Sequence, residues 1–279
     1  MVTGARVRRS IGRPELRNFD PFLMLDEFKV GLPAGFPDHP HRGFETVTFM
    51  LPQSQGSFLH EDFAGNAGEI NAGDLQWMTA GRGIMHSEMP KSGKIAHGLQ
   101  LWINLAAKHK LCAPRYQEHP ASDVRRASQD GVTAWVIAGS ALGVTSQVDT
   151  KTPVTYLYFA MEPGAALQQP VPPGHNAFAY TLSGSLEVGG RAFPAHHTLA
   201  LSRDGDGLAA RCAGDAPCSF VLISGQPIGE PIVQHGPFVM NTQREIMQAF
   251  TDFQCGSNGF ENAPGWRSEC GKLLGRTDL

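Results

Sequence analysis

Residues 36–51 read FPDHPHRGFETVTFML, in which two histidines one residue apart precede an apolar, β-branched run. Successive side chains of a strand point to opposite faces, so His39 and His41 share one face if this stretch is a strand. Two imidazoles on one face form a candidate metal chelate. The alternative is a pair of loop histidines that are hydrogen-bonded to the backbone, and the rest of the chain must decide.

A second pair of candidate ligands lies in residues 73–90, GDLQWMTAGRGIMHSEMP, where His86 and Glu88 are two positions apart beside a glycine-rich turn. Two strands of one barrel can aim these side chains and the first two histidines at a single point. Three imidazoles and one carboxylate suit iron, manganese, copper, nickel or zinc, with open positions on an octahedral metal. The lack of a thiolate disfavours a closed structural zinc site.

Glu45 competes with Glu88 for the role of carboxylate ligand. It follows His41 by four residues, which places both on the same face of a continuous strand. Alternation alone therefore does not choose between the two glutamates.

Runs of β-branched and aromatic residues recur along the chain, and most are bounded by Gly, Pro, Asn or Asp. They lie at 44–51, 97–105, 131–139, 152–161, 176–190 and 218–225. Few helical stretches separate them, which predicts an all-β sandwich or barrel rather than a parallel α/β sheet. A weak internal repeat, in which a Pro-x-x-His-like start precedes a strand, predicts two similar antiparallel barrels over residues 1–120 and 121–279.

One helix is predicted near the end of the chain, in NTQREIMQAFTDFQCG at 241–256. Thr242 followed by Glu245 fits a capping box, and Gly256 is the expected end of the helix. The apolar face, which we expect to pack on the barrels, consists of Ile246, Ala249, Phe250 and Phe253.

The composition of the 279-residue chain excludes several classes of protein. A net charge of −3 and a pI near 6.4 are unlike those of a dedicated nucleic-acid binder. The five cysteines lack CxxC spacing and are interpreted as reduced thiols of an intracellular protein. We expect a soluble monomer without a signal peptide or membrane span. No phosphate-binding loop or GxSxG elbow is present.

The second half of the chain lacks the paired ligands of the first half. His175 is followed by Asn-Ala rather than by x-His, and no later HxE appears. His196 and His197 are adjacent, so on a strand they would face opposite ways. We therefore expect no metal in the C-terminal barrel.

Three further groups of residues have a structural interpretation that we prefer to a functional one. His60, Glu61 and Asp62 form a polar cluster that we expect to be a solvated edge or a hydrogen-bonded rim. The methionines near the candidate ligands are interpreted as pocket lining rather than as ligands, and four aromatic residues as core rather than as a substrate platform. These are Met78, Met85 and Met89, and Phe36, Phe44, Phe58 and Trp77.

A basic edge precedes the first barrel. Arg6, Arg8, Arg9, Arg13 and Arg17 form either a solvated strand edge that is protected from pairing, or a docking strip for an acidic partner.

A family resemblance rests on HPHRGFE (39–45) and GDLQWMTAGRG (73–83), supported by FDPFLMLDEF (19–28), HGLQLWINL (97–105) and QHGPFVMNT (234–242). These motifs resemble the two cupin motifs of the pirins, particularly of the animal type. The resemblance implies a bicupin of two jelly-roll barrels with one Fe(II)/Fe(III) per chain in the N-terminal barrel. It also implies the ligands His39, His41, His86 and Glu88.

The resemblance implies two functions that are not exclusive. One is quercetin 2,3-dioxygenase activity on a flavonol and O₂, with Glu88 as the general base that takes the 3-hydroxyl proton. The other is a redox-sensitive transcription co-regulator in the nucleus and cytoplasm. It would bind transcription-factor partners through Arg6, Arg8 and Arg17, without sequence-specific DNA binding of its own. The alternative is a metal-dependent dioxygenase with no role in transcription.

Overall fold

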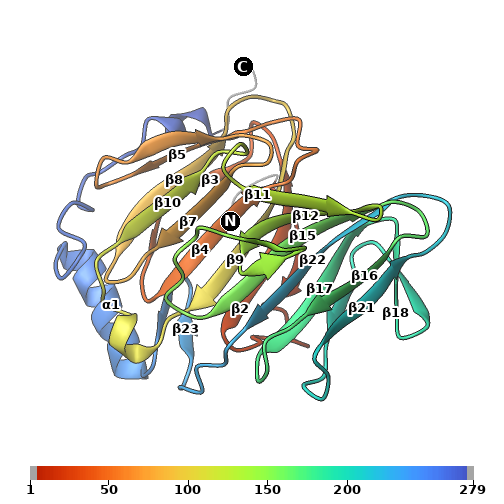
Figure 1. The fold of residues 1–279 in the computed structure, drawn as a ribbon. Helices are drawn as coiled ribbons and strands as arrows, with labels where there is room; N and C mark the ends of the chain where they lie inside the picture. The colour runs from red at the N-terminus through yellow and green to blue at the C-terminus, as the bar shows by residue number, and fades with distance from the viewer. Residues whose placement is uncertain (1–4, 275–279) are drawn as a thin grey trace. The chain divides into compact units, whose positions relative to one another are not determined.

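The structure, a computed structural model, describes residues 5–274 and comprises two compact units (Figure 1). Unit 1 contains the described residues up to Arg9, Phe22–Ala121 and the described residues from Ile228 onward. Unit 2 contains Ser10–Pro21 and Ser122–Pro227. The chain thus passes from unit 1 to unit 2 next to the predicted domain boundary, and it returns to unit 1 at Ile228.

Unit 1 is built from two antiparallel sheets. The six-stranded sheet has the order β1-β2-β9-β4-β7-β10, and the four-stranded sheet has the order β3-β8-β5-β6. The strands are β1 (Arg6–Ile11), β2 (Phe22–Val30), β3 (Phe36–His41), β4 (Phe44–Met50), β5 (Phe58–Asp62), β6 (Ala67–Ile70), β7 (Leu75–Thr79), β8 (Ile84–Pro90), β9 (Ala96–Asn104) and β10 (Arg115–His119).

Unit 2 repeats this plan, with a six-stranded sheet β11-β12-β15-β22-β17-β20 and a four-stranded sheet β16-β21-β18-β19. The two similar antiparallel barrels predicted from the sequence are confirmed. The strands are β11 (Arg125–Gln129), β12 (Val132–Ala138), β15 (Val154–Met161), β16 (Ala166–Pro170), β17 (Asn176–Ser183), β18 (Ser185–Val188), β19 (Arg191–Pro194), β20 (Thr198–Ala200), β21 (Gly207–Cys212) and β22 (Cys218–Gly225).

Two short hairpins and two 3₁₀ turns complete the secondary structure of the described residues outside the single α-helix. The hairpins pair β13 with β14 and β23 with β24. These elements are β13 (Ser140–Ala141), β14 (Val144–Thr145), β23 (Val233–His235), β24 (Phe238–Met240), η1 (Ala107–His109) and η2 (Cys270–Leu273).

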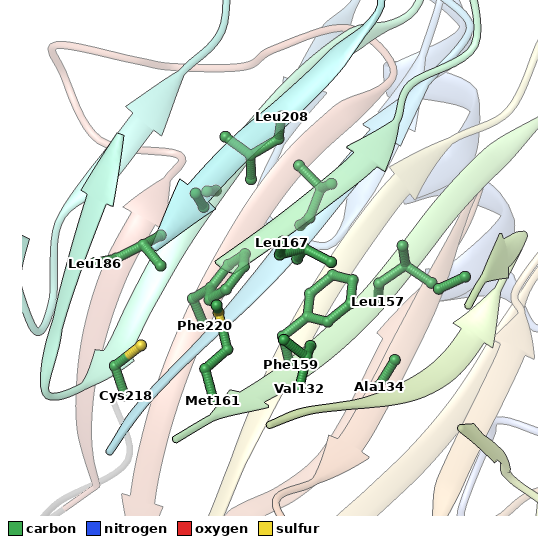
Figure 2. Packing of buried hydrophobic residues seen from close by; sticks show 14 of the residues in the cluster. Val132, Ala134, Leu157, Phe159, Met161, Leu167, Leu186, Leu208, Cys218 and Phe220 are labelled. Atoms are coloured by element: carbon green, nitrogen blue, oxygen red, sulfur yellow. The ribbon is translucent and has the colours of Figure 1, made fainter. Parts of the chain in front are cut away.

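The interior of unit 2 is apolar. Side chains from both of its sheets interdigitate, and Phe159 stacks on Phe220 with ring centroids 5.2 Å apart (Figure 2). Leu167, Leu186 and Leu208 of the four-stranded sheet belong to the same buried cluster. Dense apolar packing of this kind stabilises the barrel by the hydrophobic effect.

The barrel of unit 1 has an apolar cluster and a separate polar interior. Phe28 and Phe58 stack with ring centroids 4.9 Å apart, and both pack with Met50 and Ile70. Elsewhere in this barrel the buried side chains include histidines, threonines, glutamates and Gln76. The two units thus share one strand plan but differ in what fills the barrel.

The helix α1 (Gln243–Cys255) belongs to unit 1 and has the predicted caps. Thr242 and Glu245 form the capping box, and Gly256 ends the helix in the left-handed conformation at φ 62°. Ile246 and Ala249 are buried against Phe238 of β24, which confirms the predicted apolar face. In residues 5–274 no helix is both long and apolar enough to cross a membrane.

Candidate metal centre

The pairing of β3 with β8 brings the three predicted histidines together. His39 lies directly opposite His86 in the antiparallel register, and His41 lies two positions further along β3. Because β3 is extended, the two histidines of the HPH motif face the same side, as the spacing predicts. His41 and His86 are buried and His39 is half-buried.

The three imidazole rings converge on one point. Their ring centroids lie 4.4–5.0 Å apart, and one ring nitrogen from each falls within 4.8 Å of the others. Nε2 of His86 lies 3.0 Å from Nε2 of His39. Within residues 5–274 this is the only group of three or more histidine, cysteine or acidic side chains arranged closely enough for a metal ion.

The surroundings prepare these rings for metal binding. Nδ1 of His39 lies 2.8 Å from the carbonyl oxygen of Pro37, and a carbonyl only accepts, so Nδ1 carries the proton and Nε2 presents its lone pair. Burial lowers the pKa of His39, and it lowers the pKa values of His41 and His86 well below the usual 6.5. All three rings are therefore neutral near pH 7, which is the form that binds metal. The residues present fit a transition metal.

Glu88 lies on β8, next to the three histidines. It follows His86 by two residues in β8, so it shares the face of that histidine, and on β5 it lies opposite His60. Burial raises its pKa, although the hydrogen bond from Thr48 acts in the opposite direction. Its carboxylate accepts that bond from Thr48 Oγ1 at 2.9 Å and is not in the close group of three histidines. Its role as the fourth ligand stays a prediction.

Glu45 does not share the face of His41, so the alternation argument that made it a competitor is wrong. β3 ends at His41, and β4 begins at Phe44 in the other sheet, so the alternation is interrupted. Gly43 makes the break at φ +89°, and a Cβ there would lie 2.0 Å from the carbonyl oxygen of Val239. Glu45 instead accepts a hydrogen bond from Thr79 Oγ1 at 2.7 Å, its cross-strand partner on β7.

A hydrogen-bonded cluster of polar side chains surrounds His60, and the sequence predicted only part of it. His60 Nε2 lies 2.8 Å from Glu118 Oε1, and Gln76 donates to the same oxygen at 2.9 Å. Tyr116 stacks over the His60 ring with centroids 6.1 Å apart. His60 and Asp62 are buried, so the prediction of a solvated edge is wrong and that of a hydrogen-bonded cluster is confirmed. The sequence did not predict that Glu118 and Gln76 belong to this cluster, because only strand alternation distinguishes them from other polar strand residues.

Aromatic side chains form one wall beside His41. The Phe44 ring lies 5.1 Å from the His41 ring and the Trp102 ring 5.2 Å from it, and these two aromatic rings lie 4.5 Å apart. Phe44 is fully buried, as expected for core, whereas Trp102 is only half-buried. Trp102 was not singled out by the sequence, although it shares the strand parity of Gln100 in β9. Of these two rings, Trp102 retains accessible surface next to the candidate metal centre.

The remaining predicted aromatic and methionine positions are mostly core. Phe58 and Trp77 are buried, and Phe36 packs against the Phe28 cluster. Met85 alternates with His86 and packs against Phe238, so it does not line the histidine face as predicted. Met78 and Met89 are fully buried.

The histidines of unit 2 lie apart from such a site. His175 is half-buried, with Nδ1 3.3 Å from Ser224 Oγ. His196 and His197 are exposed in the turn before β20, not on a strand as assumed, and His196 has a positive φ of 68°. That the C-terminal barrel binds no metal stays a prediction, and the apolar packing of its interior supports it.

The predicted partner residues are exposed. Arg6 and Arg8 project from β1 in unit 1, and Arg17 lies in unit 2. Arg9 is engaged instead in a two-bond ion pair with Asp26, at 2.7 and 2.8 Å.

Two barrels of cupin type, one with a histidine-rich centre, define the class of the protein as a bicupin. The comparison of the chain with known families gives the particular family: residues 4–103 match Pirin, and residues 156–259 match the Pirin C-terminal cupin domain. The chain belongs to the pirin family, as its motifs indicated.

Close relatives cover almost the whole chain. A pirin-like protein from tomato (Solanum lycopersicum) is 57% identical over 95% of this chain and 91% of its own length. Human pirin is 54% identical over 96% of this chain and 93% of its own length. Among solved structures, a quercetin 2,3-dioxygenase from Acinetobacter baumannii is similar with a TM-score of 0.82 and 31% identity, covering 91% of this chain and 96% of that one.

Proposed function

We propose that this protein is a metal-dependent dioxygenase that binds iron through His39, His41, His86 and Glu88 and opens the ring of a flavonol with O₂. The observation that carries the proposal is the convergence of three neutral imidazoles within 4.8 Å, two of them buried, with a buried carboxylate two residues beyond His86. The similarity to a quercetin 2,3-dioxygenase supports the substrate class.

Different side chains would bind the metal, accept the substrate proton and contact the substrate ring. The bound iron would supply open coordination positions for substrate and O₂. Glu88 takes the proton of the flavonol 3-hydroxyl, because it is a buried carboxylate on the same strand face as His86. Trp102, which is half-buried beside His41, offers an aromatic face to an aromatic ring system.

An assay under air tests this proposal directly. Protein purified without a histidine tag is analysed for metals, loaded with Fe(II) and incubated with quercetin while the absorbance of the flavonol is followed. We expect loss of the quercetin absorbance, and in Glu88→Gln a loss of turnover that exceeds any loss of iron. Unchanged absorbance with stoichiometric iron would exclude quercetin as a substrate.

A second role, as a redox-sensitive transcription co-regulator in the nucleus and cytoplasm, rests on the exposed arginines. Arg6 and Arg8 leave two cationic groups on the edge strand β1 for an acidic protein partner. The test compares partner binding by ferrous and ferric protein, and by the charge-reversed variants Arg8→Glu and Arg17→Glu. Equal binding in all cases would remove this role and leave a dioxygenase without a function in transcription.

A further inference from the structure

Thr48 lies between the candidate base and a glutamine. Its Oγ1 is 2.9 Å from Glu88 Oε1 and 2.5 Å from Gln100 Oε1. Thr48 and Gln100 are cross-strand partners on β4 and β9, whereas Glu88 comes from β8 in the other sheet. Thr48 and Glu88 are buried and Gln100 is half-buried. The hydroxyl therefore joins the two sheets of unit 1 at the carboxylate.

The proton count fixes the direction of this chain of hydrogen bonds. A threonine hydroxyl has one hydrogen, so it does not donate to two acceptors at once. When Glu88 is ionised it only accepts, so the Thr48 hydrogen points to the carboxylate. Gln100 then has to donate to Thr48, which it does when its amide turns by half a rotation and presents the NH₂ group in place of the oxygen. The chain runs from the Gln100 amide to the Thr48 hydroxyl to the Glu88 carboxylate.

We propose that Thr48, itself held by Gln100, is a positioning residue that fixes the orientation of the Glu88 carboxylate next to the three histidines. This inference rests on the proposed role of Glu88 in the metal centre. Oriented hydrogen bonds to a ligating carboxylate hold it at the angle the metal requires, and their loss typically reduces metal affinity about 10- to 100-fold. Because Thr48 acts through Glu88, its contribution should vanish when Glu88 no longer carries a charge.

The structure offers a matched control in Thr79. This threonine of β7 is also fully buried and donates to a buried glutamate, Glu45, at 2.7 Å, and Glu45 lies on the opposite face of β4 from Thr48. Thr79→Val therefore removes the same kind of bond without touching the candidate metal centre. Thr48→Ser keeps the hydroxyl and serves as the conservative variant.

The experiment measures the affinity of the full chain for Co(II), a redox-stable probe, by competition with a chelator, together with the absorption spectrum of the bound Co(II). We expect Thr48→Val to weaken Co(II) binding by about 10- to 100-fold and to alter the spectrum. Thr48→Ser should stay close to the wild type and Thr79→Val should leave the affinity unchanged. In a Glu88→Gln background, Thr48→Val should add no further loss.

Three outcomes would overturn the inference: an unchanged affinity in Thr48→Val, an equal loss in Thr79→Val, or an undiminished loss in the Glu88→Gln background. Thermal unfolding of each variant without metal shows whether it is folded at the assay temperature. Neither flavonol nor O₂ enters the measurement, so a failed quercetin assay and a failed Thr48 test are separate results.

Discussion

Arg42 and Asp252 form a buried ion pair in which Arg42 Nη1 lies 2.7 Å from Asp252 Oδ2. The residue that follows His41 is thereby joined to α1. The same guanidinium donates to the carbonyl oxygens of Arg82 and Asn258 and lies 4.8 Å above the Phe260 ring. The C-terminal helix is thus anchored to the end of the strand that carries two of the candidate ligands.

Removing one partner of this pair should strongly destabilise unit 1. Asp252→Ala leaves the Arg42 charge buried without its carboxylate, which costs about 3–5 kcal/mol of unfolding free energy. Urea denaturation measures the loss. Arg244→Ala, at an exposed position of the same helix, is the control and should change stability by less than about 0.5 kcal/mol. Similar effects for both variants would contradict the anchoring role.

The two glutamates of the first barrel should respond differently to neutralisation. Glu88→Gln removes a charge beside the three histidines and should weaken Co(II) or Fe(II) binding about tenfold or more. Glu45 lies on the face of β4 opposite Thr48, and Glu45→Gln keeps an acceptor for Thr79 of β7, so this variant should bind metal like the wild type. Metal analysis and competition with a chelator measure the metal affinity of the two variants. A loss confined to Glu45→Gln would place the carboxylate ligand on β4.

Metal binding should withstand mild acid. If the three histidines kept the ordinary pKa near 6.5, each would be half protonated at that pH, and affinity would fall about eightfold relative to pH 8. Burial lowers their pKa values, so protons compete only at lower pH. We therefore expect a fall well short of eightfold between pH 8 and 6.5, measured by calorimetric titration of Co(II) into Glu88→Gln, in which the raised pKa of Glu88 no longer contributes. An eightfold fall would show that the rings are not shielded.

Lys110 should make the unfolding free energy of the protein rise with pH in the alkaline range. Its buried ammonium group donates to Asn104 Oδ1 at 2.6 Å and to the carbonyl oxygens of Gly43 and Val239, and burial lowers its pKa to about 8. Between this value and the unfolded value of 10.5, the unfolded chain binds the proton and the folded chain does not. Unfolding free energy therefore gains up to about 1.4 kcal/mol per pH unit from this group as pH rises through that window.

Urea denaturation at pH 7.5 and pH 10 measures this contribution as the difference between the wild type and Lys110→Met. The difference should shift in favour of the wild type at the higher pH. The neighbouring exposed Lys108→Met is the control and should show no such shift. A pH-independent difference for Lys110→Met would mean that its charge is not penalised by burial.

The sequence alone determined the strand-rich fold, the terminal helix with its caps, and the shared face of His39 and His41. Each of these depends on residues close in the chain, because side-chain alternation and capping are local properties. Similarly, the spacing of His86 and Glu88 placed both on one face of β8 without reference to any other strand.

Only the tertiary structure decided which strands meet. The break at Gly43 moves β4 into a different sheet from β3, and so turns Glu45 away from the histidines and Thr48 toward Glu88. Gln100 joins Thr48 through cross-strand pairing, and Ile228 onward returns to unit 1 so that Asp252 reaches Arg42. These contacts join residues 40 to 210 positions apart, and such partners are set by sheet order and packing, which no local pattern encodes.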